Sequence, residues 1–298
     1  MKMMTMMMMM MVKANSEPLS STYHVQCKNP IAITSESFVG GTYVSSRHSK
    51  TSNENVKQHP VNIDSASLYQ GSRLDFKDKN LIKAAKRLAD EDKKNKLTLR
   101  IGGSAADDLS MFHNSSDFAI YMEEEYWDEI VNFVKSCNLN LAWDLNMRVG
   151  RSKNGSATWD SQDAVRLLER IVSESQTVWA FQVGNEPGHW QTRNHGSPNA
   201  LTHADDFLAF RRILDEYFPN ESDRPRLQGA DVCMGHGTDT SPCANMTYFS
   251  DLVKRAAGVL DDITVHTYGL TGPKGSRPDQ CEIQYFLDRK EFSSGVRT

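Results

Sequence analysis

Short runs of apolar residues recur along the chain and alternate with segments in which apolar residues repeat every three or four positions. Runs of β-branched and aromatic residues are typical of buried strands, and the longer repeat is typical of helices that cover one face of a sheet. The runs predict six strands, at residues 38–44, 97–102, 139–146, 178–184, 226–232 and 263–268. The repeats predict helices around residues 81–89, 130–134, 165–172 and 207–214.

This alternation favours an α/β fold with a parallel sheet and right-handed crossovers. Asp160 and Ser161 suit the start of the third predicted helix, and Pro219 follows the end of the fourth. A closed (β/α)8 barrel needs eight strands. With six predicted, two βα units would fall outside this chain.

The strand predicted at 178–184 leads into a motif with candidate chemistry, Gly184-Asn185-Glu186-Pro187. Pro187 disfavours helical dihedral angles at Glu186, so this residue is predicted to be extended, in line with the strand. Catalytic groups of (β/α)8 barrels stand at the carboxyl ends of strands. An Asn-Glu pair there suits glycoside hydrolysis, with the glutamate donating a proton to the leaving oxygen. The alternative is an incidental polar pair at a strand end.

Several segments, taken in their order and spacing, resemble glycoside hydrolase family 79, the heparanase-like family of retaining endo-β-glucuronidases. They are Leu-Arg-Ile-Gly-Gly-Ser at 99–104, Asp-Leu-Asn at 144–146, Thr-Trp-Asp at 158–160, Asn-Glu-Pro at 185–187, Gly-Ala-Asp-Val at 229–232 and the segment at 262–268. The resemblance implies a (β/α)8 TIM-barrel glycosidase fold, incomplete here, with about six βα units in residues 23–298. The last two units and a C-terminal β-sandwich would be absent.

The resemblance also implies a role for particular residues. Glu186 would be the catalytic acid/base, and the family's nucleophile would fall beyond Thr298, so the chain on its own is expected to be inactive. Substrate would be bound by Asn185, Ser104, His266, Tyr268 and Arg193. No cofactor and no metal are implied.

Substrate identity stays open because the chain departs from the family's pattern. Where the family has an aspartate after its first strand, this chain has Val44. Cations that could bind sulfate or carboxylate groups follow the third and fourth predicted strands, at Arg148, Arg151, Lys153, His189 and Arg193. For each of them, a solvated loop charge is the alternative.

The expected partner is heparan sulfate or a related acidic polysaccharide, with no nucleic acid. The formal net charge of -4 gives no general attraction to either polyanion, so positive charge must be local. A non-catalytic carbohydrate-binding product of the same family is the second hypothesis. A related enzyme that cleaves plant glycans or small β-glucuronides is the third.

Residues 1–22 are rich in methionine and suit either a degenerate secretory signal or a misassigned start. The apolar run is too short to span a membrane. Sequons at Asn114, Asn154, Asn220 and Asn245 are compatible with a secreted, matrix or lysosomal glycoprotein, and also with a membrane-associated one. Among five cysteines, Cys233 and Cys243 are the nearest in sequence for a bridge, and free thiols are the alternative.

Overall fold

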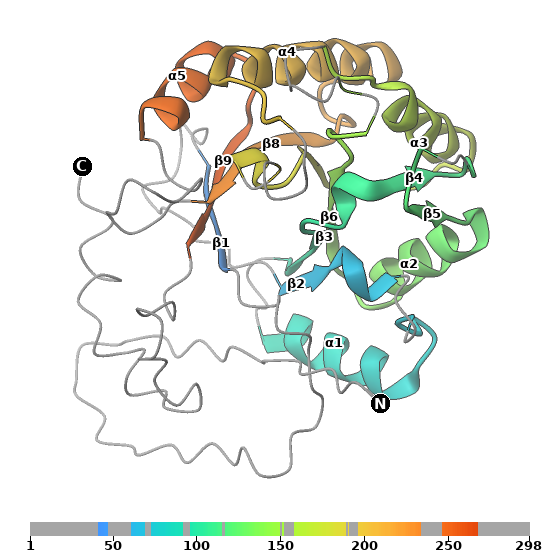
Figure 1. Cartoon of the computed structure of the whole chain (residues 1–298). Coiled ribbons are helices and arrows are strands. Elements are labelled where there is room, and N and C mark those ends of the chain that lie inside the picture. The colour runs from blue at the N-terminus through green and yellow to red at the C-terminus, as the bar shows by residue number, and fades with distance from the viewer. Residues whose placement is uncertain are drawn as a thin grey trace, which may run out of the picture. The chain divides into compact units, whose positions relative to one another are not determined.

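Six parallel strands form the centre of the structure and follow one another across the sheet in chain order (Figure 1). They are β2 (Val61–Asp64), β3 (Thr98–Gly102), β6 (Asn140–Leu145), β7 (Ala180–Val183), β8 (Arg226–Cys233) and β9 (Asp262–Thr267). This computed structural model describes residues 41–46, 61–68, 73–91, 96–114, 117–149, 151, 158–188, 190, 196–233 and 246–267. All of them belong to one unit, Gly40–Thr267.

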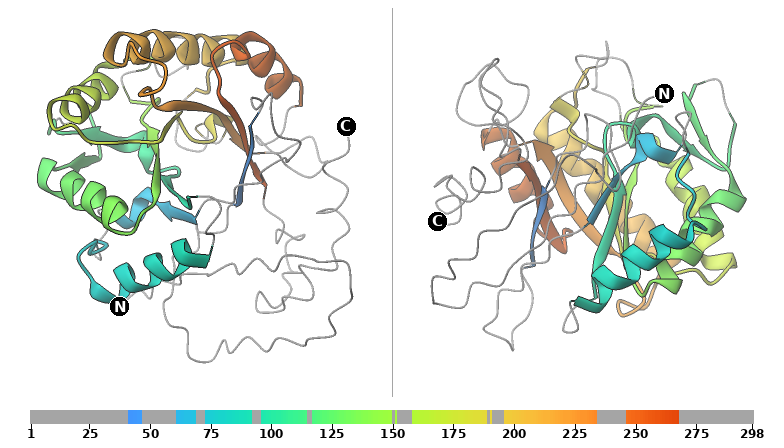
Figure 2. Two further views of the ribbon diagram at one scale, coloured as in Figure 1. Left: turned by 180° about the vertical axis from the view of Figure 1, so that it is seen from behind. Right: turned by 90° about the horizontal axis from the view of Figure 1, so that it is seen from below.

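A helix stands between each pair of consecutive parallel strands, and the helices form an arc around the outside of the sheet (Figures 1 and 2). They are α1 (Lys79–Glu91), α2 (Glu124–Ser136), α3 (Gln162–Ser173), α4 (Ala200–Tyr217) and α5 (Met246–Ala256). Between β3 and α2 the chain forms a small parallel pair, β4 (Leu109–Met111) and β5 (Ile120–Met122), while short 3-10 helices follow β2 (Ser65–Leu68) and precede β4 (Ala106–Asp108). The described residues thus supply six parallel strands of a (β/α)8 barrel, which is the number predicted, although one of the six is not a predicted strand. None of the described helices is long and apolar enough to cross a membrane.

The first predicted strand was assigned wrongly. The chain does form a strand near residues 38–44, namely β1 (Gly41–Ser46), but β1 pairs antiparallel with β9. The first parallel strand is β2, which pairs with β3 on the side opposite β6 and which the hydrophobic pattern missed. The reason is its length, because β2 contains only two apolar residues, Val61 and Ile63, and all four of its positions are only partly buried. Helix α5 was also missed, although its apolar residues carry the helical repeat.

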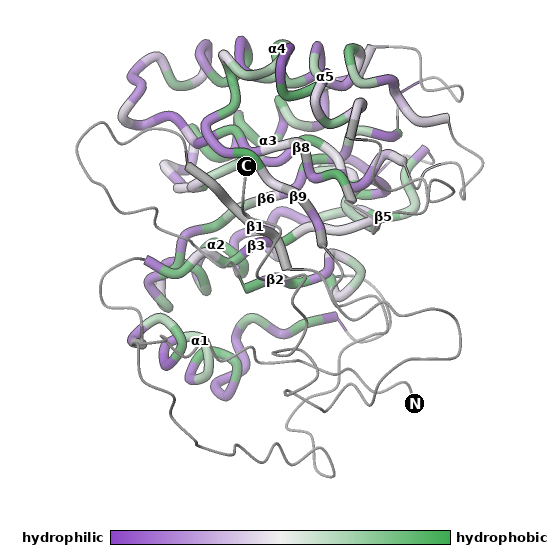
Figure 3. Tube along the Cα trace, turned by 90° about the vertical axis from the view of Figure 1, so that its left-hand side faces the viewer, coloured by the Kyte–Doolittle hydropathy of each residue, from purple (hydrophilic) through white to green (hydrophobic). Residues whose placement is uncertain are grey.

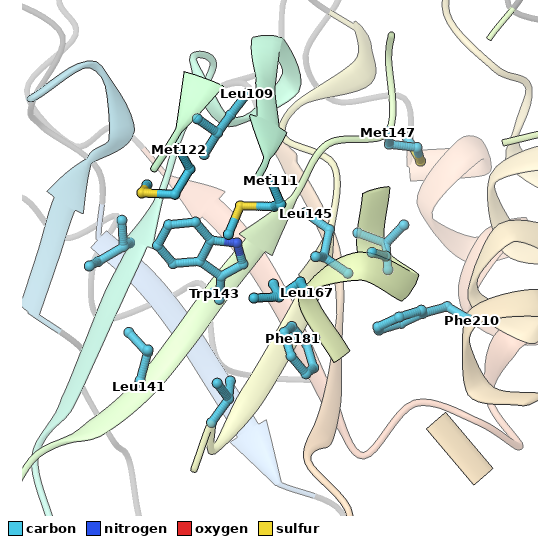
Figure 4. Packing of buried hydrophobic residues seen from close by; sticks show 14 of the residues in the cluster. Leu109, Met111, Met122, Leu141, Trp143, Leu145, Met147, Leu167, Phe181 and Phe210 are labelled. Atoms are coloured by element: carbon cyan, nitrogen blue, oxygen red, sulfur yellow. The ribbon is translucent and has the colours of Figure 1, made fainter. Parts of the chain in front are cut away.

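Apolar side chains on one face of the sheet pack against the helices and form the core. Leu99, Trp143, Phe181 and Leu227 each come from a different parallel strand and are 3% exposed or less. Trp143 meets Trp127 of α2 edge to face, with 4.9 Å between ring centroids. Figure 4 shows part of this core, with side chains from β6, β7, α3 and α4. Burying each large side chain contributes about 1.5–3 kcal/mol.

Residues at alternate positions of the same strands turn polar side chains to the opposite face. Arg100, Asp144 and Gln182 occupy such positions in β3, β6 and β7, and all three are buried. They contact one another rather than the helices. In β8, Gly229 faces the helices as Leu227 does, and an added Cβ on Gly229 would lie 2.5 Å from Phe207 Cζ of α4. The fold therefore separates an apolar core on one face from a polar cluster on the other.

Candidate active site at the carboxyl ends of the parallel strands

Asn185 and Glu186 follow the end of β7, so they stand at the carboxyl edge of the parallel strands. Gly184 has φ +78, and an added Cβ there would lie 2.8 Å from Met147, so a side chain would be both strained and crowded. Glu186 has φ 44 and so adopts a left-handed conformation. This contradicts the predicted extended conformation. The reason is tertiary, because the Glu186 backbone N–H donates to the carbonyl of Asp231, 3.0 Å away in β8.

Asp231 is held at a bulge in β8, where the register with β9 shifts between Ala230 and Val232. It too is left-handed, with φ 50. Bulges re-aim side chains near functional sites. Here the Asp231 carboxylate is completely buried, and it accepts a hydrogen bond of 3.1 Å from Gln182 Nε2.

His266 of β9 lies between these two acids. Its Nδ1 is 2.7 Å from Glu186 Oε1, and its Nε2 is 3.3 Å from Asp231 Oδ1, close enough for an ion pair. Burial alone would lower the pKa of His266, but the contacts with Asp231 and Glu186 outweigh burial and raise that pKa above its ordinary value. The two acidic neighbours therefore favour the protonated form of His266 more than water does.

Arg100 of β3 forms hydrogen bonds with three side chains of the site. Its Nε donates to Gln182 Oε1 at 2.5 Å, and one terminal nitrogen reaches both Asp144 Oδ2, at 3.2 Å, and Asn185 Oδ1, at 3.3 Å. A buried guanidinium is tolerated only when it is paired in this way. Because Arg100 binds the Asn185 oxygen, the Asn185 amide nitrogen is directed to the other side, 3.5 Å from Ser104 Oγ.

Asp144, which pairs with Arg100, and its neighbour Asp107 both have raised pKa values. Burial raises the pKa of Asp144 to about 7, against the opposing effect of Arg100. Burial and the charge of Asp144 raise the pKa of Asp107 well above its ordinary value, although Trp190 Nε1 donates to it at 3.0 Å. Strongly shifted pKa values of this kind cluster at functional sites.

Asp64 is an aspartate at the end of the first parallel strand, where the family's pattern has one and where Val44 was expected to stand. It ends β2, the first parallel strand, where it accepts a hydrogen bond of 2.9 Å from the Ala66 backbone N–H. Its Oδ1 lies 3.2 Å from the point where a Cβ would stand on Gly103, a residue with φ +109. The carboxylate that Val44 does not supply is therefore present at the same edge as Ser104. The pattern did not indicate this position because β2 carries only two apolar residues.

The structure brings together four of the predicted site residues, Ser104, Asn185, Glu186 and His266. Tyr268 and Arg193 lie outside the described residues, as do Lys153, His189 and Cys243, so their predicted roles stay predictions. Cys137 is a buried free thiol. Arg100, Gln182 and Asp231 were not predicted as part of the site, although each is a polar residue within an apolar strand.

The two predicted loop cations that the structure describes are engaged within the protein. Arg148 pairs with Asp108. Arg151 is buried and pairs with Asp206 of α4, whose pKa burial raises to about 6. Arg151 is thus neither a solvated charge nor an accessible ligand for sulfate. Among the residues described, no group of three or more His, Cys, Asp or Glu side chains could hold a metal ion.

Sequential parallel strands with outer helices, and an Asn-Glu pair at the end of one strand, define a chain of the barrel-forming glycosidase class. The model for "Glycosyl hydrolase family 79, N-terminal domain" matches residues 110–293, more than half of the sequence, and the chain belongs to this family.

The chain is also similar to the heparanases of two mammals. It is 24% identical to that of Rattus norvegicus over 152 residues and 26% identical to that of Bos taurus over 153 residues. In each case the match covers 51% of this chain and only 26% of the relative. The chain thus matches about a quarter of the length of these proteins.

Two solved structures share a distant likeness, each with a TM-score of 0.39. A family 51 α-L-arabinofuranosidase from Bifidobacterium longum is 13% identical, with 67% of this chain and 42% of that chain covered. A 4-O-α-L-rhamnosyl-β-D-glucuronidase from Fusarium oxysporum 12S is 16% identical, with 72% and 46% covered.

Proposed function

We propose that this protein is a retaining glycosidase of the heparanase type, which hydrolyses internal β-glucuronidic bonds in heparan sulfate or a related acidic polysaccharide. The observation that carries the proposal is Glu186, at the carboxyl end of β7, hydrogen-bonded to His266 and adjacent to Asn185. Membership of family 79 and the similarity to heparanases support the choice of substrate.

In the proposed reaction Glu186 acts as the general acid and then as the general base. It donates its proton to the glycosidic oxygen as the bond to the anomeric carbon breaks, and later it takes a proton from the attacking water. His266 holds the Glu186 carboxyl in place through the 2.7 Å contact. The Asn185 amide nitrogen, turned away from Arg100, donates to a sugar hydroxyl.

A retaining mechanism also needs a nucleophilic carboxylate about 5–5.5 Å from the acid/base. Asp231 is near Glu186 but is an unsuitable candidate, since it has no exposed surface and accepts a hydrogen bond from Gln182. We therefore propose that the nucleophile comes from outside the described residues, as the resemblance to the family implies.

The proposal is tested by digesting heparan sulfate with the protein and following both fragment size and the anomeric configuration of the new reducing end by NMR. Internal cleavage with retention is expected. Glu186→Gln keeps the shape but removes the acid, so turnover should fall about 10²–10⁴-fold. The matched control Glu125→Gln, on an exposed position of α2, should keep full turnover.

Inversion at the anomeric carbon, or full activity in Glu186→Gln, would contradict the assignment. Binding of heparan sulfate without cleavage by the full-length protein would replace it with the non-catalytic hypothesis.

A further inference from the structure

Helix α1 carries a row of four cations on one side. Lys79, Lys83, Lys86 and Arg87 are spaced by four, three and one residues, which places them along a single face of the helix. All four are exposed. Together with Ile82 and Asp90 they line a shallow hollow in the protein surface. Figure 3 shows hydrophilic and hydrophobic positions alternating along α1, as expected for a helix with one face turned to solvent.

These four cations have no ionic partner within the described part of the chain, whereas the cations just before the helix are paired. Arg73 and Lys77, just before the helix, pair with Glu123 and Glu129. Further along the chain, most arginines of α3 to α5 are also paired with carboxylates.

Helix stability does not account for this arrangement. Lys79 stands at the first position of α1, where the helix dipole disfavours positive charge. Lys79 and Lys83, and Lys83 and Arg87, are like charges four residues apart, which destabilises a helix slightly. No acidic residue stands in the first turn. With a formal net charge of -4, the positive face is also not a result of a generally basic composition.

The row has a definite direction relative to the active site. Helix α1 links the carboxyl end of β2 to the amino end of β3, so its first turn lies toward the edge that carries Asp64. From Lys79 to Arg87 the helix rises about 12 Å. An extended polymer lying along the row would therefore run up the side of the sheet toward the edge that bears the catalytic residues.

We infer that this face of α1 is a docking surface for a sulfated polysaccharide, separate from the catalytic residues. The choice of a sulfated partner rests on the proposed function, while the location rests on the four cations. Lysine and arginine form charge-assisted hydrogen bonds with sulfate oxygens as they do with phosphate. Repeating anionic groups on one chain could engage several cations of the row at once.

The test measures binding of the protein to immobilised heparin as a function of salt. The variant Lys83→Gln/Lys86→Gln/Arg87→Gln removes three charges from the row, and glutamine keeps a similar helix propensity. The matched control Lys135→Gln/Arg212→Gln/Lys254→Gln removes three exposed charges from α2, α4 and α5, none of them in an ion pair that the structure shows. A thermal melt of each variant checks that it is folded.

The row variant is expected to bind heparin about tenfold more weakly, with a shallower salt dependence, while the control binds like the wild type. Equal loss in both variants, or absence of heparin binding by the wild type, would overturn the inference. Equal affinity for desulfated heparin would overturn the assignment of a sulfated partner.

Hydrolysis separates this inference from the proposed function. With a small aryl glucuronide as substrate, the row variant should keep wild-type turnover. A protein that cleaves no glucuronide, but loses heparin binding in the row variant alone, would contradict the proposed function and support the docking surface.

Discussion

Glu186 and Asp231 are two non-glycine residues in left-handed conformations, and a backbone hydrogen bond joins them. Such conformations cost about 1–3 kcal/mol each and persist where the surroundings enforce them, often at functional sites. Both side chains contact His266. Glu186 is therefore positioned by β8 and β9 as well as by its own strand. No local sequence rule could predict this, because the bulge at Asp231 arises from the pairing of two strands.

The raised pKa of His266 predicts how the stability of the protein depends on pH. Its pKa in the folded protein is raised, so its contribution to stability is complete below the unfolded pKa of about 6.5 and is lost as pH rises through the folded value. Asp231→Asn removes one of its two anionic partners. The variant should show a lower His266 pKa by NMR titration, and its stability should fall less steeply above pH 6.5.

Asp205→Asn is the control for this titration, because Asp205 pairs with Arg255 at the surface of α4 and α5. It should leave the His266 pKa unchanged. The same His266 pKa in Asp231→Asn and the wild type would show that Asp231 does not hold the imidazolium.

Helix α4 is connected to the end of β7 by a buried histidine. His203 Nε2 lies 3.3 Å from the carbonyl oxygen of Val183, the last residue of β7, and Nδ1 lies 2.9 Å from the hydroxyl of Tyr248 on α5. Burial lowers the pKa of His203 to about 4, so the ring is neutral at physiological pH. Two helices thus fix the strand that ends next to Asn185.

This contact predicts acid sensitivity. Because His203 binds a proton at about pH 6.5 when unfolded and only near pH 4 when folded, stability falls as pH drops through that window, by up to about 1.4 kcal/mol per pH unit. His203→Gln should cost about 1–3 kcal/mol at neutral pH. It should also lose less stability than the wild type between pH 7.5 and pH 5.

Urea unfolding at the two pH values measures both effects of His203→Gln. Tyr248→Phe removes the hydroxyl partner but keeps the titrating ring, so it should keep the acid sensitivity. An unchanged pH dependence in His203→Gln would show that another group is responsible.

Across the whole described unit, the periodic pattern predicted five of the six parallel strands and four of the five helices, because long apolar runs report burial directly. It failed at β2, which has two apolar residues, and at β1, whose antiparallel pairing depends on distant β9. Asn185 and Glu186 could be predicted as candidates because they stand at a strand end, whereas Ser104 and His266 were predicted from the resemblance of their segments to the family. Arg100 and Gln182 could not, since a polar residue inside a strand has no partner until the strands are in register.

We propose that Glu186 is the acid/base of a retaining glycosidase, and chemical rescue of Glu186→Ala by azide tests this role most directly. With an activated aryl glucuronide the leaving group departs without protonation, so the glycosyl-enzyme forms but water attacks it slowly. Azide needs no general base, and its attack breaks the bond between the anomeric carbon and the nucleophile. We expect faster turnover with azide and a β-glucuronosyl azide product. Absence of rescue in a folded variant, or an α-configured azide, would contradict it.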